Sequence, residues 1–360
     1  MINWRDKEWV FLMKCMVLEE FNAPLVLRER EIPVPGADDV ILKVGACGIC
    51  RTDLKVWSGT HPAIRKLPQV LGHEVAGEVV EVGKSADKQL IGKHAVIYFY
   101  LSCGECGFCR SGREILCSHL KGQIGFNLDG GYAEYVKAPA NCLFLIRADI
   151  PFEEAAIITD AIATPYRALT SKARIQPEQT VAIIGAGGLG LHAIQIARTF
   201  GARVIAIDIN EKALAMAKEL GAEKTFHITK DDPTEELLEL SGGGGYDAVM
   251  DFVGKPVIQQ LGLKILKVAG KFVAVGYNPV DPFQVHSLLL VSRELEIYGS
   301  RSCGRNDLKE TIELVSSGKV KPVVAESHPL VDANVALRKL DQGDLVGRSV
   351  LVPGQGTKGK

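Results

Sequence analysis

The 360-residue sequence predicts an α/β protein with about two domains. Up to about residue 136, short apolar runs alternate with glycine-bearing turns, which is typical of a small, mainly β domain. From about residue 155, apolar strands alternate with helical patterns, which predicts a doubly wound parallel sheet. This alternation fades after residue 298, and a last apolar strand follows. We therefore expect a first domain of residues 1–161, a second of residues 162–304, and a return to the first domain over residues 305–360.

The composition is typical of a soluble globular protein, with 47% hydrophobic and 24% charged residues. A formal net charge of −1 without a basic run argues against nucleic acid as a partner. The longest apolar stretch, residues 181–197, contains polar residues and a glycine turn, so a strand–turn–helix is favoured over a membrane span. Residues 1–13 do not resemble a signal peptide, which favours a cytoplasmic protein. The nine cysteines are then expected to be metal ligands or core residues rather than disulfides.

Two candidate metal ligands flank the expected strands of the first part. Strands are expected at residues 40–46, 75–83 and 92–99; Cys50 follows the first and His73 precedes the second. A thiolate and an imidazole are usual ligands of Zn²⁺, but a metal needs a third ligand from elsewhere. With a fourth position left open, such a site acts as a Lewis acid. Taken alone, the two residues fit a buried thiol and a structural histidine equally well.

A second cluster contains four cysteines separated by two, two and seven residues: Cys103, Cys106, Cys109 and Cys117. Four thiolates can close tetrahedrally around Zn²⁺ and leave no open position, which predicts a structural zinc site. The alternatives are a pair of disulfides or an iron–sulfur cluster. The ferredoxin pattern places proline after its fourth cysteine, whereas Ser118 follows here, and zinc is favoured.

The second part carries a dinucleotide-binding fingerprint. A strand at residues 180–184 is followed by a glycine-rich turn and then by a helix that runs to residue 199. The turn contains Gly185, Gly187, Gly188, Leu189 and Gly190. Such a turn lets backbone amides approach a pyrophosphate at the start of a helix. The next strand, residues 203–207, ends at Asp208, whose carboxylate would bind the adenosine ribose and repel a 2′-phosphate, so NAD is preferred over NADP. The alternative is that Asp208 only caps the following helix.

The remaining elements complete a Rossmann sheet and return the chain to its first part. Strands are expected at residues 246–252, 271–276 and 295–298. A helix is expected at residues 306–317, followed by a strand at residues 346–352 that rejoins the first domain.

From about residue 13 to residue 353, the sequence resembles the zinc-dependent medium-chain alcohol dehydrogenases of the microbial, NAD-dependent type. Four motifs in the family's order carry the resemblance: residues 48–53, residues 72–77, the four-cysteine cluster and the glycine-rich turn. The resemblance implies a mainly β, GroES-like catalytic domain with a structural zinc lobe at residues 99–121. It also implies NAD, two Zn²⁺ per subunit, and a homo-oligomer, with a tetramer favoured over a dimer. The first dozen residues form an N-terminal extension to this pattern.

The resemblance further assigns roles around the catalytic metal. Asp160 matches the third zinc ligand, where many members have cysteine, and Glu74 matches a nearby carboxylate that can approach the metal. Asp53 would orient the imidazole of His73. Thr52 is placed to take the proton of the alcohol. The alternative is that Asp160 caps a helix and Glu74 is the third ligand.

Further roles concern the cofactor, the substrate and the proton. Beyond the glycine turn and Asp208, the expected cofactor contacts are Arg51, Val253, Val275 and Arg348. Phe99 and, less directly, Trp57 are expected to line the substrate pocket. Lys55 replaces a histidine that relays the proton in many relatives, and His61 is a possible substitute. A lysine with an unshifted pKa of about 10.4 is a poor relay near neutral pH, so either the pKa of Lys55 is lowered or the proton leaves by way of water.

The expected function is reversible hydride transfer between an apolar primary or secondary alcohol and NAD, giving an aldehyde or a ketone. Within the same family, a polyol, sugar-alcohol or threonine-type dehydrogenase is the alternative, because such enzymes tend to use carboxylate ligands like Asp160. From a different class, a non-catalytic protein that binds NAD and zinc stays open.

Overall fold

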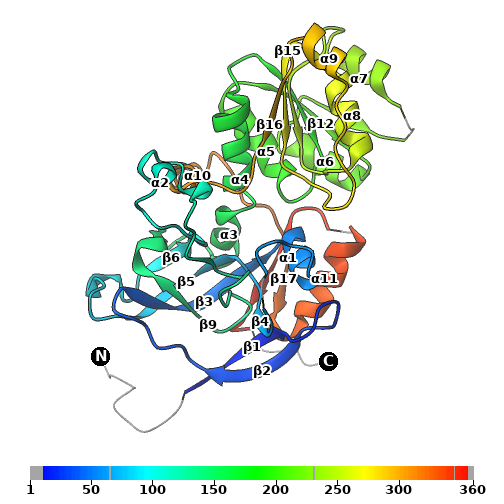
Figure 1. The fold of residues 1–360 in the computed structure, drawn as a ribbon. Helices are drawn as coiled ribbons and strands as arrows, with labels where there is room; N and C mark the ends of the chain where they lie inside the picture. Colours follow the sequence, from blue (N-terminus) through cyan, green and yellow to red (C-terminus); the bar gives the residue numbers. More distant parts are fainter. Residues whose placement is uncertain (1–10, 65, 230–231, 344, 356–360) are drawn as a thin grey trace.

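The computed structural model describes residues 11–64, 66–229, 232–343 and 345–355, and two large sheets organise this part of the chain (Figure 1). The expected N-terminal extension falls largely on residues 1–10, which lie outside the described residues. The six-stranded sheet occupies the upper half of Figure 1 and the seven-stranded sheet the lower half. None of the helices in the described segments is long and apolar enough to cross a membrane.

The seven-stranded sheet has the order β10-β6-β5-β3-β18-β17, with β9 paired to β3. Its strands are β3 (Asp39–Ile49), β5 (Glu74–Val82), β6 (His94–Ile97), β9 (Tyr135–Pro139), β10 (Leu143–Leu145), β17 (Val324–Pro329) and β18 (Arg348–Val352). The predicted return of the last strand is confirmed, because Val350 of β18 lies opposite Gly48 of β3. Smaller sheets join β1 (Leu12–Leu18), β2 (Val26–Glu31) and β4 (Gln69–Val70), and β7 (Tyr100–Leu101) with β8 (Gly122–Gln123).

The six-stranded sheet is parallel throughout and has the order β13-β12-β11-β14-β15-β16, as the doubly wound pattern predicts. Its strands are β11 (Thr180–Ile184), β12 (Arg203–Asp208), β13 (Lys224–His227), β14 (Tyr246–Asp251), β15 (Leu266–Ala274) and β16 (Glu296–Gly299). Side chains of β11 alternate between two buried clusters: Ile183 joins one and Ile184 the other. This alternation follows from the two-residue period of a strand and explains why both faces are covered by helices.

Helices connect the strands and bridge the two halves. They are α1 (Arg51–Trp57), α2 (Gly107–Arg110), α3 (Phe152–Ala156), α4 (Ala163–Arg167), α5 (Gly190–Thr199), α6 (Glu211–Glu219), α7 (Thr234–Leu240), α8 (Pro256–Lys264), α9 (Ser287–Ser292), α10 (Arg305–Ser316) and α11 (Ala333–Gln342). α5 packs against β11 and β12, whereas α8 packs against β14 and β15. α3 lies on β3 and β5, and α4 contacts α5, so the segment between residues 152 and 167 joins the two halves.

Candidate active site

The pairing of β3 with β5 brings the first two candidate ligands together. Cys50 follows the end of β3, and His73 directly precedes β5; within the ladder, Gly48 lies opposite Glu74. A Cβ atom at Gly48 would lie 2.0 Å from Oε2 of Glu74, so only glycine leaves room for this carboxylate. β18, on the other side of β3, begins with Arg348. Three neighbouring strands therefore deliver a thiol, an imidazole, a carboxylate and a guanidinium to one point.

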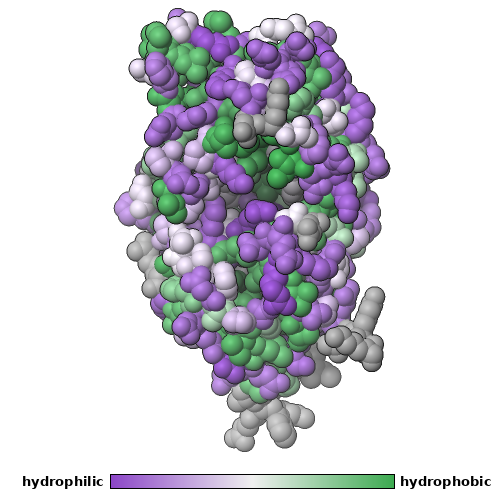
Figure 2. Space-filling model, turned by 90° about the vertical axis from the view of Figure 1, so that its right-hand side faces the viewer, coloured by the Kyte–Doolittle hydropathy of each residue, from purple (hydrophilic) through white to green (hydrophobic). Residues whose placement is uncertain are grey.

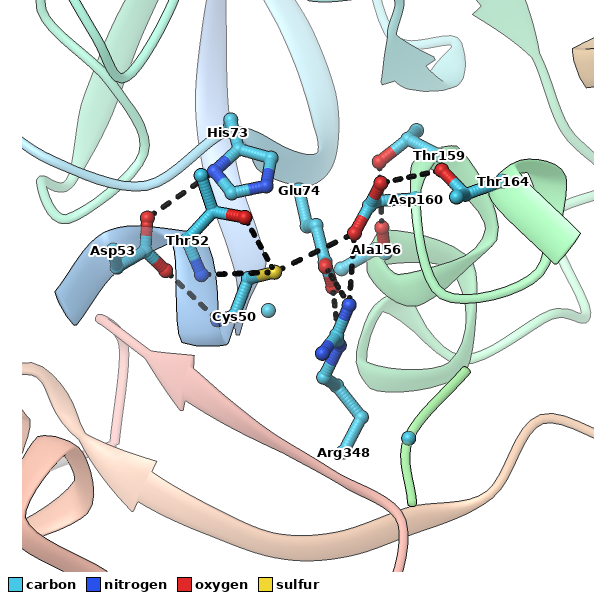
Figure 3. Close-up of polar contacts among 12 residues, drawn as sticks. Cys50, Thr52, Asp53, His73, Glu74, Ala156, Thr159, Asp160, Thr164 and Arg348 are labelled. Atoms are coloured by element: carbon cyan, nitrogen blue, oxygen red, sulfur yellow. Dashed lines mark hydrogen bonds and ion pairs between the residues drawn. The ribbon is translucent and has the colours of Figure 1, made fainter. Parts of the chain in front are cut away.

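Figure 3 shows how these side chains converge with Asp160. One donor atom from each of Cys50, His73, Glu74 and Asp160 lies within 4.8 Å of the other three, and all four residues are buried. Cys50 Sγ lies 3.5 Å from Asp160 Oδ2. Thiolate, imidazole and carboxylate form a donor set that suits Zn²⁺ in a catalytic site. The structure thus brings together every residue that the sequence suggested for this centre.

Asp53 holds the imidazole of His73 and the backbone of Cys50 in position. Its Oδ1 lies 3.1 Å from Nδ1 of His73, and its Oδ2 accepts the backbone N–H of Cys50 at 2.8 Å. The phenol of Tyr132 donates to the same Oδ2 at 3.0 Å. A carboxylate on Nδ1 leaves Nε2 of His73 to face the cluster, which is the arrangement that metal-binding histidines use.

The two carboxyl groups of the cluster differ in their protonation. Burial works against ionisation of both. For Asp160, the charges of Arg348 and His73 outweigh burial and lower its pKa. For Glu74, burial dominates and raises the pKa to about 8. The neighbouring cations thus hold Asp160 in its ionised form.

Arg348 ties the two carboxyls together. Its Nη2 lies 2.9 Å from Asp160 Oδ2 and 2.6 Å from Glu74 Oε1. Thr164 donates its hydroxyl to the other oxygen of Asp160 at 2.6 Å. The side chain of Asp160 caps no helix, because the N-cap of α4 is Ile162. Asp160 and Glu74 both lie in the ligand cluster with Cys50 and His73, and both are joined to Arg348.

Aromatic rings surround His73. The ring centroid of Phe99 lies 5.0 Å from that of His73, and Phe126 lies at 4.9 Å. The ring centroid of His61 lies 4.8 Å from that of Phe126. Burial and the neighbouring His73, Lys55 and Arg301 lower the pKa of His61 to about 4, so it is neutral. Phe99 thus packs on the imidazole of a candidate metal ligand. Phe126 is a further neighbour of His73 that sequence reasoning missed, since no local motif marks it.

Trp57 does not join these rings in any described contact. Its indole N–H donates to the backbone carbonyl of Ala23 at 2.6 Å. Around α1, Lys55 and Trp57 lie about 200° apart, so they face opposite sides of the helix. The expectation that Trp57 lines the substrate pocket therefore finds no support here.

The four cysteines of the second cluster also converge. Neighbouring sulfurs lie 3.5 to 3.9 Å apart, and all four thiols are free. Tetrahedral zinc with Zn–S bonds of about 2.3 Å requires sulfurs roughly 3.8 Å apart. A disulfide requires about 2.05 Å. The geometry fits a metal and rules out disulfides within the cluster.

The glycine-rich turn has the form that a pyrophosphate requires. Gly185 adopts φ +95°, and a Cβ at Gly190 would lie 1.8 Å from the carbonyl of Gly185. α5 begins directly after this turn. Asp208 accepts the backbone N–H of Ala186 and, at 2.9 Å, that of Asn210. The N-cap of α6 is Asn210 rather than Asp208, so the capping alternative is wrong.

The other expected cofactor residues differ in how close they lie to the glycine-rich turn. Val253 Cγ2 would be 2.9 Å from a Cβ at Gly185, and Arg348 Nη1 would be 3.3 Å from a Cβ at Gly188. Val275 follows β15 and donates its backbone N–H to Asp251. Arg51 opens α1 and points toward the end of α11, with Nη2 3.7 Å from a Cβ built on Gly343. Arg348 thus lies between the glycine turn and the ligand cluster.

Comparison with known proteins gives the same picture. The chain matches the model of the alcohol dehydrogenase GroES-like domain over residues 36–148 and that of the zinc-binding dehydrogenases over residues 188–317. An NAD-dependent alcohol dehydrogenase of Sulfurisphaera tokodaii is 36% identical over 351 residues, covering 95% of this chain and 100% of the relative. An alcohol dehydrogenase of Geobacillus stearothermophilus is 37% identical, covering 94% of this chain and 98% of the relative.

Solved structures agree in fold over the same extent. The crystal structure of the alcohol dehydrogenase of Aeropyrum pernix superimposes with a TM-score of 0.88 at 33% identity, covering 94% of this chain and 100% of that chain. An acetophenone reductase of Geotrichum candidum in complex with NAD gives a TM-score of 0.87 at 32% identity, covering 96% of this chain and 98% of that chain. Since these similarities extend over nearly the whole length, the chain belongs to the zinc-dependent medium-chain alcohol dehydrogenase family.

Proposed function

We propose that the protein oxidises apolar primary or secondary alcohols to aldehydes or ketones with NAD, and that it catalyses the reverse reduction. The observation that carries the proposal is the convergence of Cys50, His73 and Asp160 beside Glu74 and Thr52. Cys50, His73 and Asp160 would hold a zinc ion, and Glu74, joined to Arg348, would be the carboxylate that approaches the metal during exchange. Zinc supplies Lewis acidity, which lowers the pKa of an alcohol hydroxyl.

Thr52 would take the proton of the alcohol. Its Oγ1 lies 3.5 Å from Cys50 Sγ, so the hydroxyl borders the ligand cluster. A hydroxyl can accept one proton while donating its own to the next group or to water. Burial lowers the pKa of Lys55 to about 8, so its side chain is still mostly charged at neutral pH, and the ammonium donates to the carbonyl of Tyr277 at 3.1 Å. We therefore expect the proton to leave by way of water.

The cofactor would be NAD rather than NADP. NAD serves as the hydride acceptor. Asp208 ends β12 beside the glycine turn, where its carboxylate would bind the ribose hydroxyls and repel a 2′-phosphate. Arg348, within reach of both the turn and the ligand cluster, would meet the pyrophosphate, and Arg51 would meet it from α1.

Zinc in the four-cysteine cluster would bring the count to two ions per subunit and would hold residues 99–121 as a structural lobe. We propose the division into residues 1–161, 162–304 and 305–360. We also propose a homo-oligomer, with a tetramer favoured; β16 forms an edge of the six-stranded sheet and could pair with a second copy. The nine free cysteines favour the cytoplasm.

One assay tests the proposal. NADH formation is followed with NAD and a panel of simple alcohols, with sorbitol and with threonine, before and after removal of metal by a chelator. Oxidation of simple alcohols that chelation abolishes and zinc restores is the expected result. Faster oxidation of sorbitol or threonine would favour the alternative dehydrogenases of this family. No turnover of any substrate by zinc-loaded protein would contradict the proposal.

A further inference from the structure

The lobe that contains the four cysteines has a buried carboxylate that contacts the chain outside the lobe. Glu114 lies shortly before Cys117, and only 7% of it is exposed. Its Oε1 accepts the backbone N–H of Arg305, the first residue of α10. A Cβ at Gly304 would lie 3.3 Å from the same oxygen, so the carboxylate packs against the start of the helix. In Figure 1 the lobe, marked by α2, lies next to α10.

A second carboxylate and a guanidinium complete this contact. Asp307 Oδ2 accepts the backbone N–H of Gly304 at 2.7 Å and pairs with Nη1 of Arg167 at 3.1 Å. The side chains of Arg167 and Asp307 are only 10% and 12% exposed. Buried charges are costly unless they are paired and hydrogen-bonded, so these contacts fix the first turn of α10 in one arrangement. The start of α10 is therefore tied to the lobe by Glu114 and to α4 by Arg167.

The start of α10 is also linked to Asp160. Cys303, which precedes Gly304, is fully buried, and its thiol donates to the backbone carbonyl of Thr159 at 3.6 Å. Thr159 directly precedes Asp160. Arg167 ends α4, and Thr164 of the same helix donates its backbone N–H to the carbonyl of Asp160 at 2.9 Å. Figure 3 shows Thr159 and Thr164 beside Asp160 in the ligand cluster.

The segment before α10 crosses between the two parts of the molecule. Residues 300–304 connect β16 of the six-stranded sheet to α10. Figure 2 shows that one face of the molecule is hollowed between its upper and lower parts. A crossing segment therefore needs contacts of its own to hold it in place. The phenol of Tyr98 donates to the carbonyl of Cys303 at 3.1 Å, and Glu114 adds the contact from the lobe.

We propose that Glu114 is a positioning residue: it holds the start of α10, which in turn holds residues 159–160 and so orients Asp160. The inference rests on the proposed function, with Asp160 as a zinc ligand. It goes beyond that function because it gives the four-cysteine lobe a role in metal binding at the cluster of Cys50, His73 and Asp160. Loss of a residue that orients a metal ligand typically lowers metal affinity by about 10- to 100-fold. Glu114 acts through the backbone, so its effect lies at the lower end of this range.

The test measures metal binding at the catalytic cluster by a signal other than turnover. Co²⁺ replaces the ion of that cluster, and its visible absorption bands report the arrangement of its ligands. The chelator concentration that removes half of the Co²⁺ gives the affinity, and elemental analysis checks that zinc stays in the four-cysteine site. Glu114→Leu, which removes the acceptor, should shift the bands and lower the affinity for Co²⁺ by about tenfold. Glu114→Gln, which keeps an oxygen acceptor for Arg305, should keep the wild-type spectrum.

Two further variants serve as control and as independent test. Glu105→Leu makes the same substitution at an exposed position of the same lobe and should leave spectrum and affinity unchanged. Arg167→Met leaves the lobe intact and breaks the ion pair between α4 and α10, so it should change both in the same direction as Glu114→Leu. The double variant should lose less affinity than the product of the two fold-changes, because both substitutions release the same helix start. Losses that simply multiply would contradict this shared action.

The outcomes separate this inference from the function on which it rests. A wild-type spectrum and affinity in Glu114→Leu, with zinc retained in the four-cysteine site, overturn the inference alone. A lower Tm with an unchanged spectrum also overturns it, because a merely structural contact predicts that result. If Glu114→Leu loses the zinc of its lobe or does not fold, Glu114→Asp, whose carboxylate is withdrawn by one methylene, is judged by the same criteria. Wild-type protein that holds no Co²⁺ at the Cys50 cluster and oxidises no alcohol overturns both the proposed function and this inference.

Discussion

His192 offers a test of the structure that needs no substrate. The side chain is fully buried on α5, where Nδ1–H donates to the carbonyl of Gly188 at 2.6 Å and Nε2 accepts the backbone N–H of Val323 at 3.0 Å. Both ring nitrogens are therefore used in the neutral form. A proton on Nε2 would face the N–H of Val323, donor against donor, and burial would leave the charge without water.

The size of the effect follows from the pKa. Burial lowers the pKa of His192 to about 4, from a usual value of 6.5. A folded-state pKa below that of the unfolded chain means that the stability is fully present above pH 6.5 and is lost as the pH falls toward 4. Between pH 7 and pH 5 this group alone should remove about 2 kcal/mol from the free energy of unfolding.

Urea unfolding followed by circular dichroism measures this loss. His192→Gln is less stable than wild type at pH 7, but its side chain does not titrate. The difference between the two proteins should therefore shrink by about 2 kcal/mol on going to pH 5. His286→Gln, at an exposed position, should follow the wild-type curve. If wild type and His192→Gln lose stability equally between pH 7 and pH 5, the buried neutral imidazole described here is wrong.

Three further changes test the proton route, the four-cysteine metal site and the cofactor site. Thr52→Val should lower kcat/KM for ethanol by roughly 10² or more, as loss of a general base does. Lys55→Ala should lower the same kcat/KM only a few fold. Comparable losses for the two variants in steady-state assays would contradict the assigned proton route. Cys106→Ser should lose one zinc per subunit, as measured by elemental analysis, and its Tm should fall by more than about 5 °C. Cys142→Ser, at a buried thiol outside the cluster, should keep both ions. Asp208→Ser should raise KM for NAD about tenfold and admit NADP; unchanged discrimination would show that Asp208 does not select the cofactor.

The fold was most predictable where its determinants are local. Strand 180–184, the glycine turn and the helix after it coincide with β11 and α5, because apolar runs and tight turns carry their own signal. β17 and α11 were missed. β17 has the sequence VAESHP, too polar to mark a strand, and it forms because it pairs with β18. Such pairing depends on partners distant in sequence, which periodicity cannot show.

For the site, motif residues were found and their surroundings were not. Cys50, His73 and Asp160 could be listed from motifs, but the rings around His73 could not, since Phe126 comes from a segment without a recognisable pattern. Trp57 was the less direct pocket candidate, and in the structure its indole N–H donates to the backbone carbonyl of Ala23. Arg348 was expected only at the pyrophosphate; its two buried ion pairs depend on β18 returning beside β3.

With Asp160 as the proposed third zinc ligand, Arg348 would help to hold a carboxylate at the place where the resemblance implies cysteine in many relatives. A carboxylate has two oxygens and a broad choice of metal geometry, whereas a thiolate offers one large donor atom, so a carboxylate ligand needs more restraint. Here Thr164 holds one oxygen at 2.6 Å and Arg348 holds the other at 2.9 Å. The same guanidinium lies against the glycine turn, where a pyrophosphate would compete for it. In the proposed site, a carboxylate at this position would therefore connect the orientation of a metal ligand to occupation of the coenzyme site. A cysteine, which accepts such hydrogen bonds only weakly, would largely lack this connection.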